Sequence, residues 1–268
     1  MEGREVLIEF RDVHKSFGPK YVHRGIDLAI YKGETITILG GSGQGKSVLL
    51  KELIGLMKPD KGEILFRGQD IARMGEEELQ EVRTQISMLF QGGALFDFLT
   101  VGENVAYPLR EHFKKMSEAE IQRTVLDKLA MVGLSGTEDL YPADLSGGMQ
   151  KRAGLARAIA TTPAVVLYDE PTTGLDPTNV RNINEMIQRL QRESGVTSVA
   201  ITHDLESAFA FSDRLAFLYR GRILAVGTVE EMRRSPEERV RKFLEGTMEE
   251  LIEGIQAEPQ AAGAPGGG

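Results

Sequence analysis

The sequence predicts an α/β protein whose central β-sheet is mainly parallel and buried. Three short apolar runs, at residues 35–39, 164–168 and 196–202, end in glycine or polar residues, and helical patterns lie between them. Strands that alternate with helices in this way are typical of parallel sheets covered by helices on both faces. The length of 268 residues suits one such domain with a modest subdomain and a tail.

Composition and charge limit the classes of function. Apolar residues make up 41% of the chain and charged residues 27%, which are ordinary values for a folded protein. The formal net charge of -8 disfavours nucleic acid as the main partner, because non-specific nucleic-acid binders are usually basic. The absence of cysteine excludes disulfides, thiolate zinc sites and cysteine nucleophiles.

The sequence also bears on membrane insertion. It contains no run of about 18 apolar residues and no apolar stretch near its start that resembles a secretion signal. We therefore expect that the chain does not cross a membrane, and that other subunits would form any transport path.

Local patterns predict the remaining elements in order. Strands are expected at residues 6–10 and 26–30, and residues 62–68 have the pattern of a strand that enters a turn. Residues 48–56 are predicted to form a helix after a glycine-rich loop. Ser117, with a glutamate three residues later, forms a capping-box pattern that predicts a helix through residue 129.

The C-terminal part differs from the rest. After a main domain at residues 1–235, apolar residues recur at helical spacing, which predicts an amphipathic helical extension at 236–256. Its apolar stripe could contact a second copy of the chain or fold back on its own domain, and both alternatives stay open. Residues 257–268 are rich in Ala, Gly and Pro and are expected to form a flexible tail.

A glycine-rich loop between a buried strand and a helix predicts a nucleotide site. The glycines let backbone N–H groups approach phosphate oxygens, and the helix N-terminus adds positive potential. Lys46 is expected to contact the β- and γ-phosphates, and the Ser47 hydroxyl is expected to bind Mg²⁺. GTPases, kinases and helicases share the pattern G-x-x-x-x-G-K-[ST] of P-loop NTPases. Its residues here are Gly40, Gly41, Ser42, Gly43, Gln44, Gly45, Lys46 and Ser47.

Two adjacent carboxylates end a later apolar strand. Asp169 and Glu170 follow residues 165–168, and strand alternation points their side chains in different directions. We therefore expect different roles for them. Asp169 is placed to hold Mg²⁺, directly or through water, and Glu170 to act as the general base on a water that attacks the γ-phosphate.

Residues 145–150 (Leu-Ser-Gly-Gly-Met-Gln) form a second anion-binding pattern and open a predicted helix that runs to residue 160. Ser146 is an N-cap type of residue, and Gly147 and Gly148 expose backbone N–H groups at a helix N-terminus. Lys46 already occupies one side of a γ-phosphate. A second site in the same chain therefore has no obvious phosphate of its own to bind.

These motifs, in this order, resemble the ATPases of the ABC transporter family over roughly residues 6–235. Residues 145–150 resemble the signature motif of that family, and residues 174–177 resemble its D-loop. The resemblance implies an ABC ATPase fold. This fold has a P-loop NTPase (RecA-like) core, an antiparallel β subdomain and an inserted helical subdomain, here at about residues 92–160.

The resemblance also implies ATP and Mg²⁺ and assigns roles to single residues. Phe17 matches the aromatic residue that stacks on adenine, although a phenylalanine is more often part of a core. Gln91 matches the glutamine that senses the γ-phosphate and the transport partner, and His203 matches the switch histidine. The implied catalytic residues are Lys46, Gln91, Glu170 and His203. The implied Mg²⁺ ligands are Ser47, Gln91 and Asp169.

In the family, the signature closes on ATP held by a second copy of the chain. Residues implied to contact the partner's nucleotide are Ser146, Gly147 and Gly148, and Asp176 in the D-loop is also implied to bind nucleotide. Two ATP molecules then hold a head-to-tail dimer together, and hydrolysis removes the preference for the closed state.

The segments at residues 87–112 and 239–246 closely resemble the ATPases of Mce-type lipid transporters, including the bacterial Mla system. This implies an ATPase at the cytoplasmic face of the inner membrane that moves phospholipid or another hydrophobic substrate. The implied partners are integral-membrane permease subunits, an Mce-domain substrate-binding protein and a STAS-domain regulator, without nucleic acid. A groove for the permease would be lined by Leu95, Phe96, Phe98 and Leu99, unless these residues pack inside the helical subdomain.

Two other functions stay open. One is the motor of an ABC transporter for another solute. The other is a soluble ABC protein that acts as a nucleic-acid or ribosome switch. The acidic balance argues against the switch, as does the lack of long insertions, zinc-binding cysteines or a second fused ATPase unit.

Overall fold

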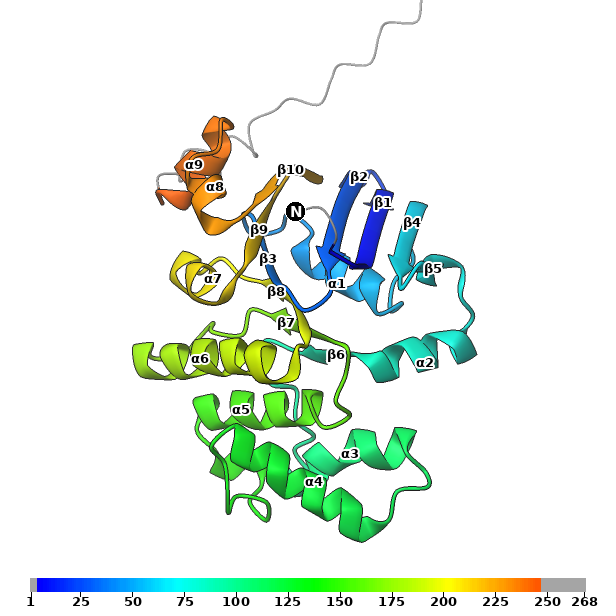
Figure 1. Cartoon of the computed structure of the whole chain (residues 1–268), viewed down its shortest axis with the longest axis vertical. Helices are drawn as coiled ribbons and strands as arrows, with labels where there is room; N and C mark the ends of the chain where they lie inside the picture. Colours follow the sequence, from blue (N-terminus) through cyan, green and yellow to red (C-terminus); the bar gives the residue numbers. More distant parts are fainter. Residues whose placement is uncertain (1–3, 247–268) are drawn as a thin grey trace, which may run out of the picture.

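The computed structural model describes residues 4–246, which form two β-sheets surrounded by helices (Figure 1). The smaller sheet is antiparallel, with the strand order β2-β1-β4-β5. The larger sheet has the order β10-β9-β3-β8-β7-β6 and is parallel except for β10. The strands are β1 (Val6–Phe17), β2 (Lys20–Tyr31), β3 (Thr35–Leu39), β4 (Lys61–Phe66), β5 (Gln69–Asp70), β6 (Ile86–Leu89), β7 (Val165–Asp169), β8 (Thr197–Ile201), β9 (Arg214–Tyr219) and β10 (Arg222–Gly227).

The helices group around the larger sheet. Figure 1 shows α3, α4 and α5 together at one end of the molecule and α8 and α9 beside β10 at the other. The α-helices are α1 (Lys46–Leu53), α2 (Glu76–Gln85), α3 (Val101–His112), α4 (Glu118–Met131), α5 (Gly147–Ala158), α6 (Pro177–Ser194), α7 (Leu205–Phe211), α8 (Val229–Arg233) and α9 (Glu238–Leu244). This architecture confirms the predicted α/β fold with an antiparallel sheet beside a mainly parallel one.

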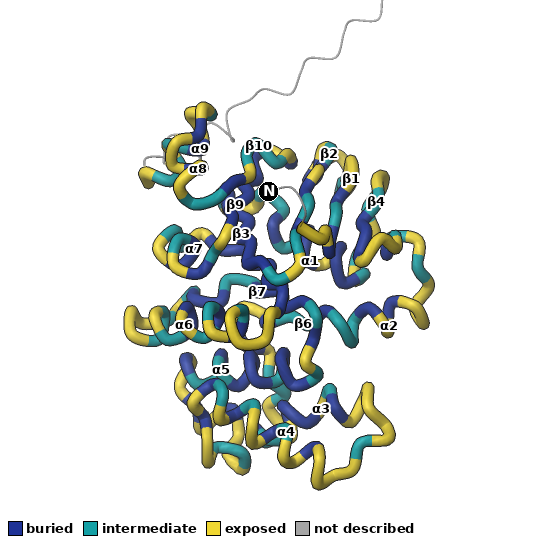
Figure 2. Tube along the Cα trace, viewed as in Figure 1, coloured by how far each residue is buried: buried dark blue, intermediate teal, exposed yellow. Residues whose placement is uncertain are grey.

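Most residues of the parallel strands are buried, as Figure 2 shows in dark blue. All five residues of β3 are buried. Ile36 and Ile38 pack in the core around α1, whereas Leu39 packs with α7 and α9, because successive strand residues point to opposite faces. Full burial of such a side chain contributes about 1.5–3 kcal/mol. The end of β3, where the glycine-rich loop begins, is therefore firmly held.

The segment before α3 is fixed by a buried amide. Thr100 caps α3 and forms a capping box with Glu103. Asn104 is fully buried, and its side chain accepts a hydrogen bond from the backbone N–H of Phe96 (2.8 Å) and donates to the carbonyls of Phe96 (3.1 Å) and Leu99 (3.2 Å). These bonds give residues 96–99 a defined conformation without regular secondary structure.

The predicted strands at residues 6–10 and 26–30 are parts of two longer strands. β1 and β2 have twelve residues each and pair along most of their length. Their register shifts between Phe10 and Val13, and such bulges interrupt the alternation from which a strand is recognised. The predicted capping box of α4 is confirmed: the Ser117 side chain accepts from the N–H of Glu120.

The described part of the C-terminal extension packs on its own domain. Val240 in α9 is fully buried, and the ring of Phe243 lies 4.9 Å from that of Phe217 in β9. For these residues, this is the arrangement of a helix that folds back. The rest of the predicted extension and the predicted tail lie outside residues 4–246, and the predicted domain boundaries stay predictions. Within the described range, no helix is both long and apolar enough to span a membrane.

Candidate functional site

A cavity of about 410 Å³ opens where the parallel strands β3 and β7 end. In open parallel sheets, ligands commonly bind at this edge. The cavity brings the glycine-rich loop together with Phe17, Glu170 and His203, which are far apart in the sequence. Its lining residues are Phe17, Lys20, Val22, Ser42, Gly43, Gln44, Gly45, Lys46, Ser47, Val48, Glu170 and His203.

The loop requires glycine where it packs against neighbouring strands. Gly45, which precedes α1, has a φ of 97°, and a Cβ atom there would lie 2.4 Å from Val22 Cγ1. At Gly40, a Cβ atom would lie 2.4 Å from the carbonyl oxygen of Leu218 in β9. These close approaches hold the loop against β2 and β9 and direct α1 with its N-terminus toward the cavity.

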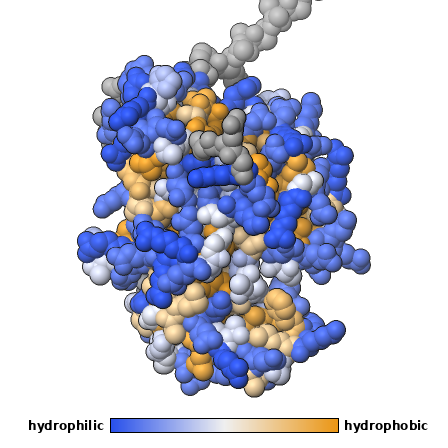
Figure 3. All heavy atoms as spheres, viewed as in Figure 1, coloured by the Kyte–Doolittle hydropathy of each residue, from blue (hydrophilic) through white to orange (hydrophobic). Residues whose placement is uncertain are grey.

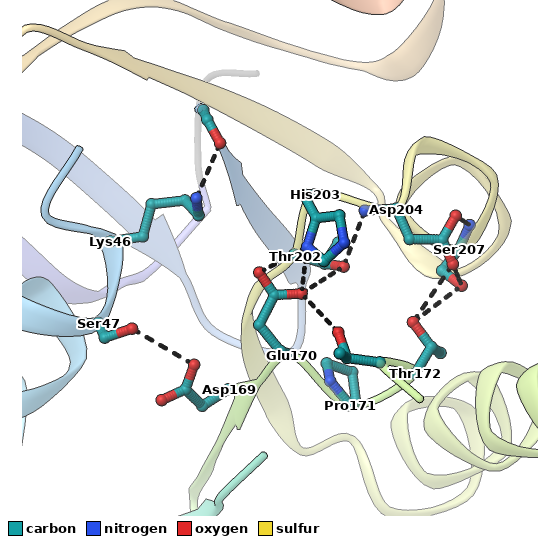
Figure 4. Close-up of polar contacts among 12 residues, drawn as sticks. Lys46, Ser47, Asp169, Glu170, Pro171, Thr172, Thr202, His203, Asp204 and Ser207 are labelled. Atoms are coloured by element: carbon teal, nitrogen blue, oxygen red, sulfur yellow. Dashed lines mark hydrogen bonds and ion pairs between the residues drawn. The ribbon is translucent and has the colours of Figure 1, made fainter. Parts of the chain in front are cut away.

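Lys46 begins α1 and is only 8% exposed. Its Nζ donates to the carbonyls of Gly40 (2.8 Å) and Gly41 (3.0 Å), as Figure 4 shows in part. Burial lowers the pKa of Lys46, while the charges of Glu170 and Asp169 act to raise it. The ammonium group is thus held by the loop carbonyls, where the sequence pattern predicts a phosphate contact.

A buried pair beneath the loop was not predicted. His23 in β2 and Glu52 in α1 have fully buried side chains, with His23 Nδ1 3.0 Å from Glu52 Oε2. These two atoms are close, but their geometry is not that of a hydrogen bond. On the other side of the ring, Nε2 lies 3.1 Å from the carbonyl oxygen of Gly45. The pair therefore links β2, α1 and the end of the loop.

The two predicted Mg²⁺ ligands nearest the loop lie side by side. The Ser47 hydroxyl donates to Asp169 Oδ1 at 3.4 Å (Figure 4). The pKa of Asp169 is raised by burial and by the charge of Glu170, and the Ser47 hydrogen bond lowers it. A hydroxyl and a carboxylate at this separation fit a hard cation that takes oxygen ligands. Among residues 4–246, no group of three or more His, Cys, Asp or Glu side chains could hold a metal ion.

Glu170 has a constrained backbone and side chain. Its φ of 51° lies in the left-handed region, which costs a non-glycine residue about 1–3 kcal/mol. Its carboxylate accepts hydrogen bonds from Thr173 Oγ1 (3.1 Å) and Thr202 Oγ1 (3.2 Å), and it lies 3.0 Å from His203 Nδ1 (Figure 4). The two threonines were not predicted, and neither carries a local sequence signal beyond its place beside a motif residue.

Some predicted site residues lie away from the cavity. Gln91 is exposed in the loop after β6 and does not line the cavity. The residues at the starts of α5 and α6 do not line it either. There, Ser146 accepts from the N–H of Met149 (3.3 Å), and Asp176 accepts from the N–H of Thr178 (3.0 Å). Both helix starts are therefore capped by their own side chains, outside the cavity.

The aromatic candidates are partly exposed. Phe17 is 47% exposed and lines the cavity, so it is not a core residue. Phe98 is 77% exposed, whereas Leu95 packs against the core of the helices α3, α4 and α5. Figure 3 shows apolar residues at the surface near α3. The predicted groove residues therefore differ in burial: Leu95 packs inside, whereas Phe98 is exposed and could contact a partner.

Comparison with known families and proteins agrees with this geometry. The profile of the family described as ABC transporter matches residues 23–173. The probable ribonucleotide transport ATP-binding protein mkl of Mycobacterium tuberculosis is 42% identical, over 96% of this chain and 73% of its own length. The intermembrane phospholipid transport system ATP-binding protein MlaF is 42% identical in Haemophilus influenzae and 41% in Escherichia coli K12. Both matches cover 90% of this chain and about nine-tenths of the relative.

Solved structures are similar over most of the chain. One is a dimeric ATP-binding cassette in a post-hydrolysis state bound to ADP and Pi, with a TM-score of 0.77 and 32% identity. That match covers 83% of this chain and 98% of the cassette. Another is cbiO1 from Clostridium perfringens, part of the transporter complex cbiONQ, with a TM-score of 0.79 and 28% identity. It covers 93% of this chain and 99% of the other.

Proposed function

The chain belongs to the ABC transporter family of ATPases, and from this premise we propose that it is the ATP-hydrolysing subunit of a bacterial envelope transporter for phospholipid or another hydrophobic substrate. One observation carries the proposal: the cavity combines the phosphate loop with Glu170 and His203, while the signature residues lie outside it. The MlaF relatives, whose names state phospholipid transport, support the substrate class.

ATP occupies the cavity with its phosphates at the glycine-rich loop. The N–H groups of the loop and the N-terminus of α1 bind the phosphate oxygens. Lys46 leaves the loop carbonyls and contacts the β- and γ-phosphates, which are better partners for an ammonium group. Phe17 at the rim stacks on the adenine, which its 47% exposure and its place in the lining permit.

Ser47 and Asp169 would hold Mg²⁺, and Gln91 is the third protein ligand that we propose. The metal would supply charge neutralisation at the phosphates. Gln91 lies in an exposed loop after β6, next to β7, which carries Asp169, in the sheet. Neither Gln91 nor Asp169 lines the cavity itself, and both lie at the ends of neighbouring strands.

Glu170 acts as the general base. Its carboxylate takes a proton from a water molecule while the water oxygen attacks the γ-phosphorus and the bond to the β–γ bridging oxygen breaks. The hydroxyls of Thr173 and Thr202 hold the carboxylate in place. His203 is 64% exposed at the cavity edge, so its ring can turn from Glu170 to the γ-phosphate.

A second copy of the chain completes each ATP site. Ser146, Gly147 and Gly148 lie at a helix N-terminus that does not line their own cavity, and Asp176 caps the neighbouring helix. They contact the nucleotide of the partner copy. The dimeric state of the similar ATP-binding cassette bound to ADP and Pi supports this arrangement.

The transport partners bind the surface near α3. Exposed Phe98 and Tyr107 form an apolar surface that suits a helix of an integral-membrane permease. With such subunits the ATPase is peripheral to the cytoplasmic face of the inner membrane. We further propose an Mce-domain substrate-binding protein and a STAS-domain regulator as partners, and no nucleic acid.

Purification of the native complex tests the proposal. We expect polytopic membrane subunits to copurify, to change the ATPase rate, and to carry phospholipid detectable by mass spectrometry. Membrane subunits without lipid, with ATPase activity stimulated by a ribonucleotide or another solute, would favour the motor of a different transporter. The names of the mycobacterial relatives point to that second candidate. Full activity without any membrane subunit, or stimulation by RNA or DNA, would contradict transport.

A further inference from the structure

Lys151 connects the signature helix to the loop that follows the general base. It lies in the second turn of α5, yet its side chain is only 6% exposed. Its Nζ donates to the carbonyl of Pro171 (3.1 Å) and to that of Thr173. Both acceptors lie within three residues of Glu170. Burial of an ammonium group costs free energy unless the group is well paired. Lys151 therefore keeps its two hydrogen bonds only while α5 and the loop stay in one relative position.

The loop that Lys151 holds determines where the base lies. Glu170 has a φ of 51°, and such a backbone persists only where the surroundings over-determine it. Thr173 belongs to both contacts: its carbonyl accepts from Lys151, and its hydroxyl donates to Glu170 Oε2 (3.1 Å). Burial lowers the pKa of Lys151 and the charge of Glu170 raises it, in agreement with their proximity.

The other end of the connection is the signature turn. Ser146 caps α5, and Gly147 and Gly148 occupy its first turn, directly before the turn that carries Lys151. Gly148 also packs on α6, because a Cβ atom there would lie 2.6 Å from Asn179 Oδ1. The signature turn therefore cannot shift without affecting either Lys151 or the start of α6.

We propose that Lys151 is a positioning residue for Glu170, which makes the placement of the base in one ATP site depend on the helix that contacts the ATP of the partner. The inference rests on the proposed function, because it needs Glu170 as base and the signature as a contact across the dimer. It assigns a role to a residue outside the nucleotide cavity. When the signature engages, α5 and the loop move as one unit, and the base reaches its working position.

The test compares Lys151→Met with a matched control on the same helix. Methionine has a similar length and no donor. The neighbouring Arg152 is also partly buried and also donates to carbonyls, at Val132 (3.3 Å) and Gly133 (3.2 Å), but these lie at the end of α4 rather than beside Glu170. Arg152→Met therefore removes one cation and two similar contacts without touching the loop of the base.

For Lys151→Met we expect kcat to fall between about ten- and a hundredfold, because small misplacements of reacting groups cost up to about a hundredfold. The KM for ATP should stay within about twofold. ATP-driven dimerisation should persist when the Lys151→Met change is combined with Glu170→Gln. Arg152→Met should change kcat by less than about twofold. Lys151→Arg, which keeps a cationic donor, should retain much of the kcat that Lys151→Met loses. A kcat near that of the unchanged protein in Lys151→Met would overturn the proposal, as would parallel losses of kcat, ATP affinity and thermal stability.

A double-mutant cycle adds an outcome that a purely structural role would not produce. Thr173→Val removes the hydroxyl contact with Glu170 but keeps the carbonyl that Lys151 binds. If both residues act through the same carboxylate, the double variant loses less than the product of the two single losses. If the two losses in kcat multiply instead, Lys151 does not act through the Glu170 carboxylate. Failure of the proposed function is distinguishable, because it would appear as retained turnover in Glu170→Gln.

Discussion

At the scale of single residues, the side chain of Glu170 has more partners than a solvent-facing strand end would have. Three side chains contact its carboxylate, although the residue sits in a left-handed backbone conformation. Conformations of this kind tend to occur at functional sites, where the surrounding structure stabilises them. Asp169, one residue earlier, instead contacts Ser47 and shows a raised pKa from burial. Adjacent carboxylates thus have separate environments, which supports separate roles.

The first prediction concerns this separation. Glu170→Gln keeps the shape of the side chain but replaces one acceptor oxygen with an NH2 donor, and the amide cannot accept the proton from water. We expect turnover to fall by at least about a hundredfold, since general bases contribute about 10²–10⁴. ATP binding should persist, and an ATP-bound dimer should accumulate in size-exclusion chromatography. Glu206→Gln, on an exposed carboxylate in α7, is the control and should hydrolyse ATP normally. Normal turnover in Glu170→Gln would remove Glu170 from the role of base.

The residues found only in the structure share one property. His23 contacts Glu52 across 29 positions of the sequence, and Lys151 contacts Pro171 across 20. Nothing in a local pattern distinguishes these charged residues from solvated ones, because their partners are brought near by the fold alone. Motif residues such as Lys46 were predictable for the opposite reason: the loop chemistry requires them at a fixed spacing.

At the scale of elements, local chemistry predicts best where an element has its own boundary signal. β3 matches its predicted range, 35–39, because it is apolar throughout and ends in glycines. The start of α4 follows from the Ser117 capping box. β6 has only four residues, and the strands β1 and β2 contain bulges, so their limits depend on pairing rather than on local pattern. The exposed Gln91 follows β6, and its approach to the nucleotide stays a prediction.

Gly147 and Gly148 are expected to have different roles in the signature turn. A Cβ atom at Gly148 would lie 2.6 Å from Asn179, whereas one at Gly147 would meet nothing within 4 Å. Gly148→Ala should therefore displace the Asn179 side chain and break its hydrogen bond to Asp176, which offsets the helix preference of alanine. Gly147→Ala should keep or raise stability, because alanine favours a helix by up to about 1 kcal/mol over glycine. Thermal melts followed by circular dichroism measure this difference.

The same pair tests how the turn contacts a partner. In the Glu170→Gln background, Gly147→Ala should weaken ATP-driven dimerisation, since its Cβ atom projects to the surface where the phosphates of the partner nucleotide approach. The effect of Gly148→Ala on stability should be the same with and without ATP, because it arises from the contact with Asn179 in the same chain. If Gly147→Ala forms the dimer as readily as its parent, the turn does not contact the partner nucleotide in the proposed way.

At the scale of the whole molecule, we propose that the cavity and the signature turn are two parts of one site, which two copies bring together. The cavity is lined by the phosphate loop and Glu170, but no residue at the start of α5 or α6 lines it. Helix N-termini that face solvent gain stabilisation from a phosphate only if another molecule delivers it. In a head-to-tail dimer, the signature turn of each copy would meet the nucleotide in the cavity of the other. Both copies would then use the same two surfaces.

Engineered cysteines can test this pairing without background, because the chain contains no cysteine of its own. One preparation carries Ser42→Cys at the cavity, and the other carries Ser146→Cys at the signature, both in the Glu170→Gln background. After mixing, a short bis-maleimide should link the two chains when ATP is present and not without it. Ser194→Cys replaces Ser146→Cys in the control. It lies at the far end of the 18-residue helix α6, about 27 Å from its start, and should give no link. Links between two Ser42→Cys chains instead would indicate that cavities face each other directly, and the signature would then need a different partner.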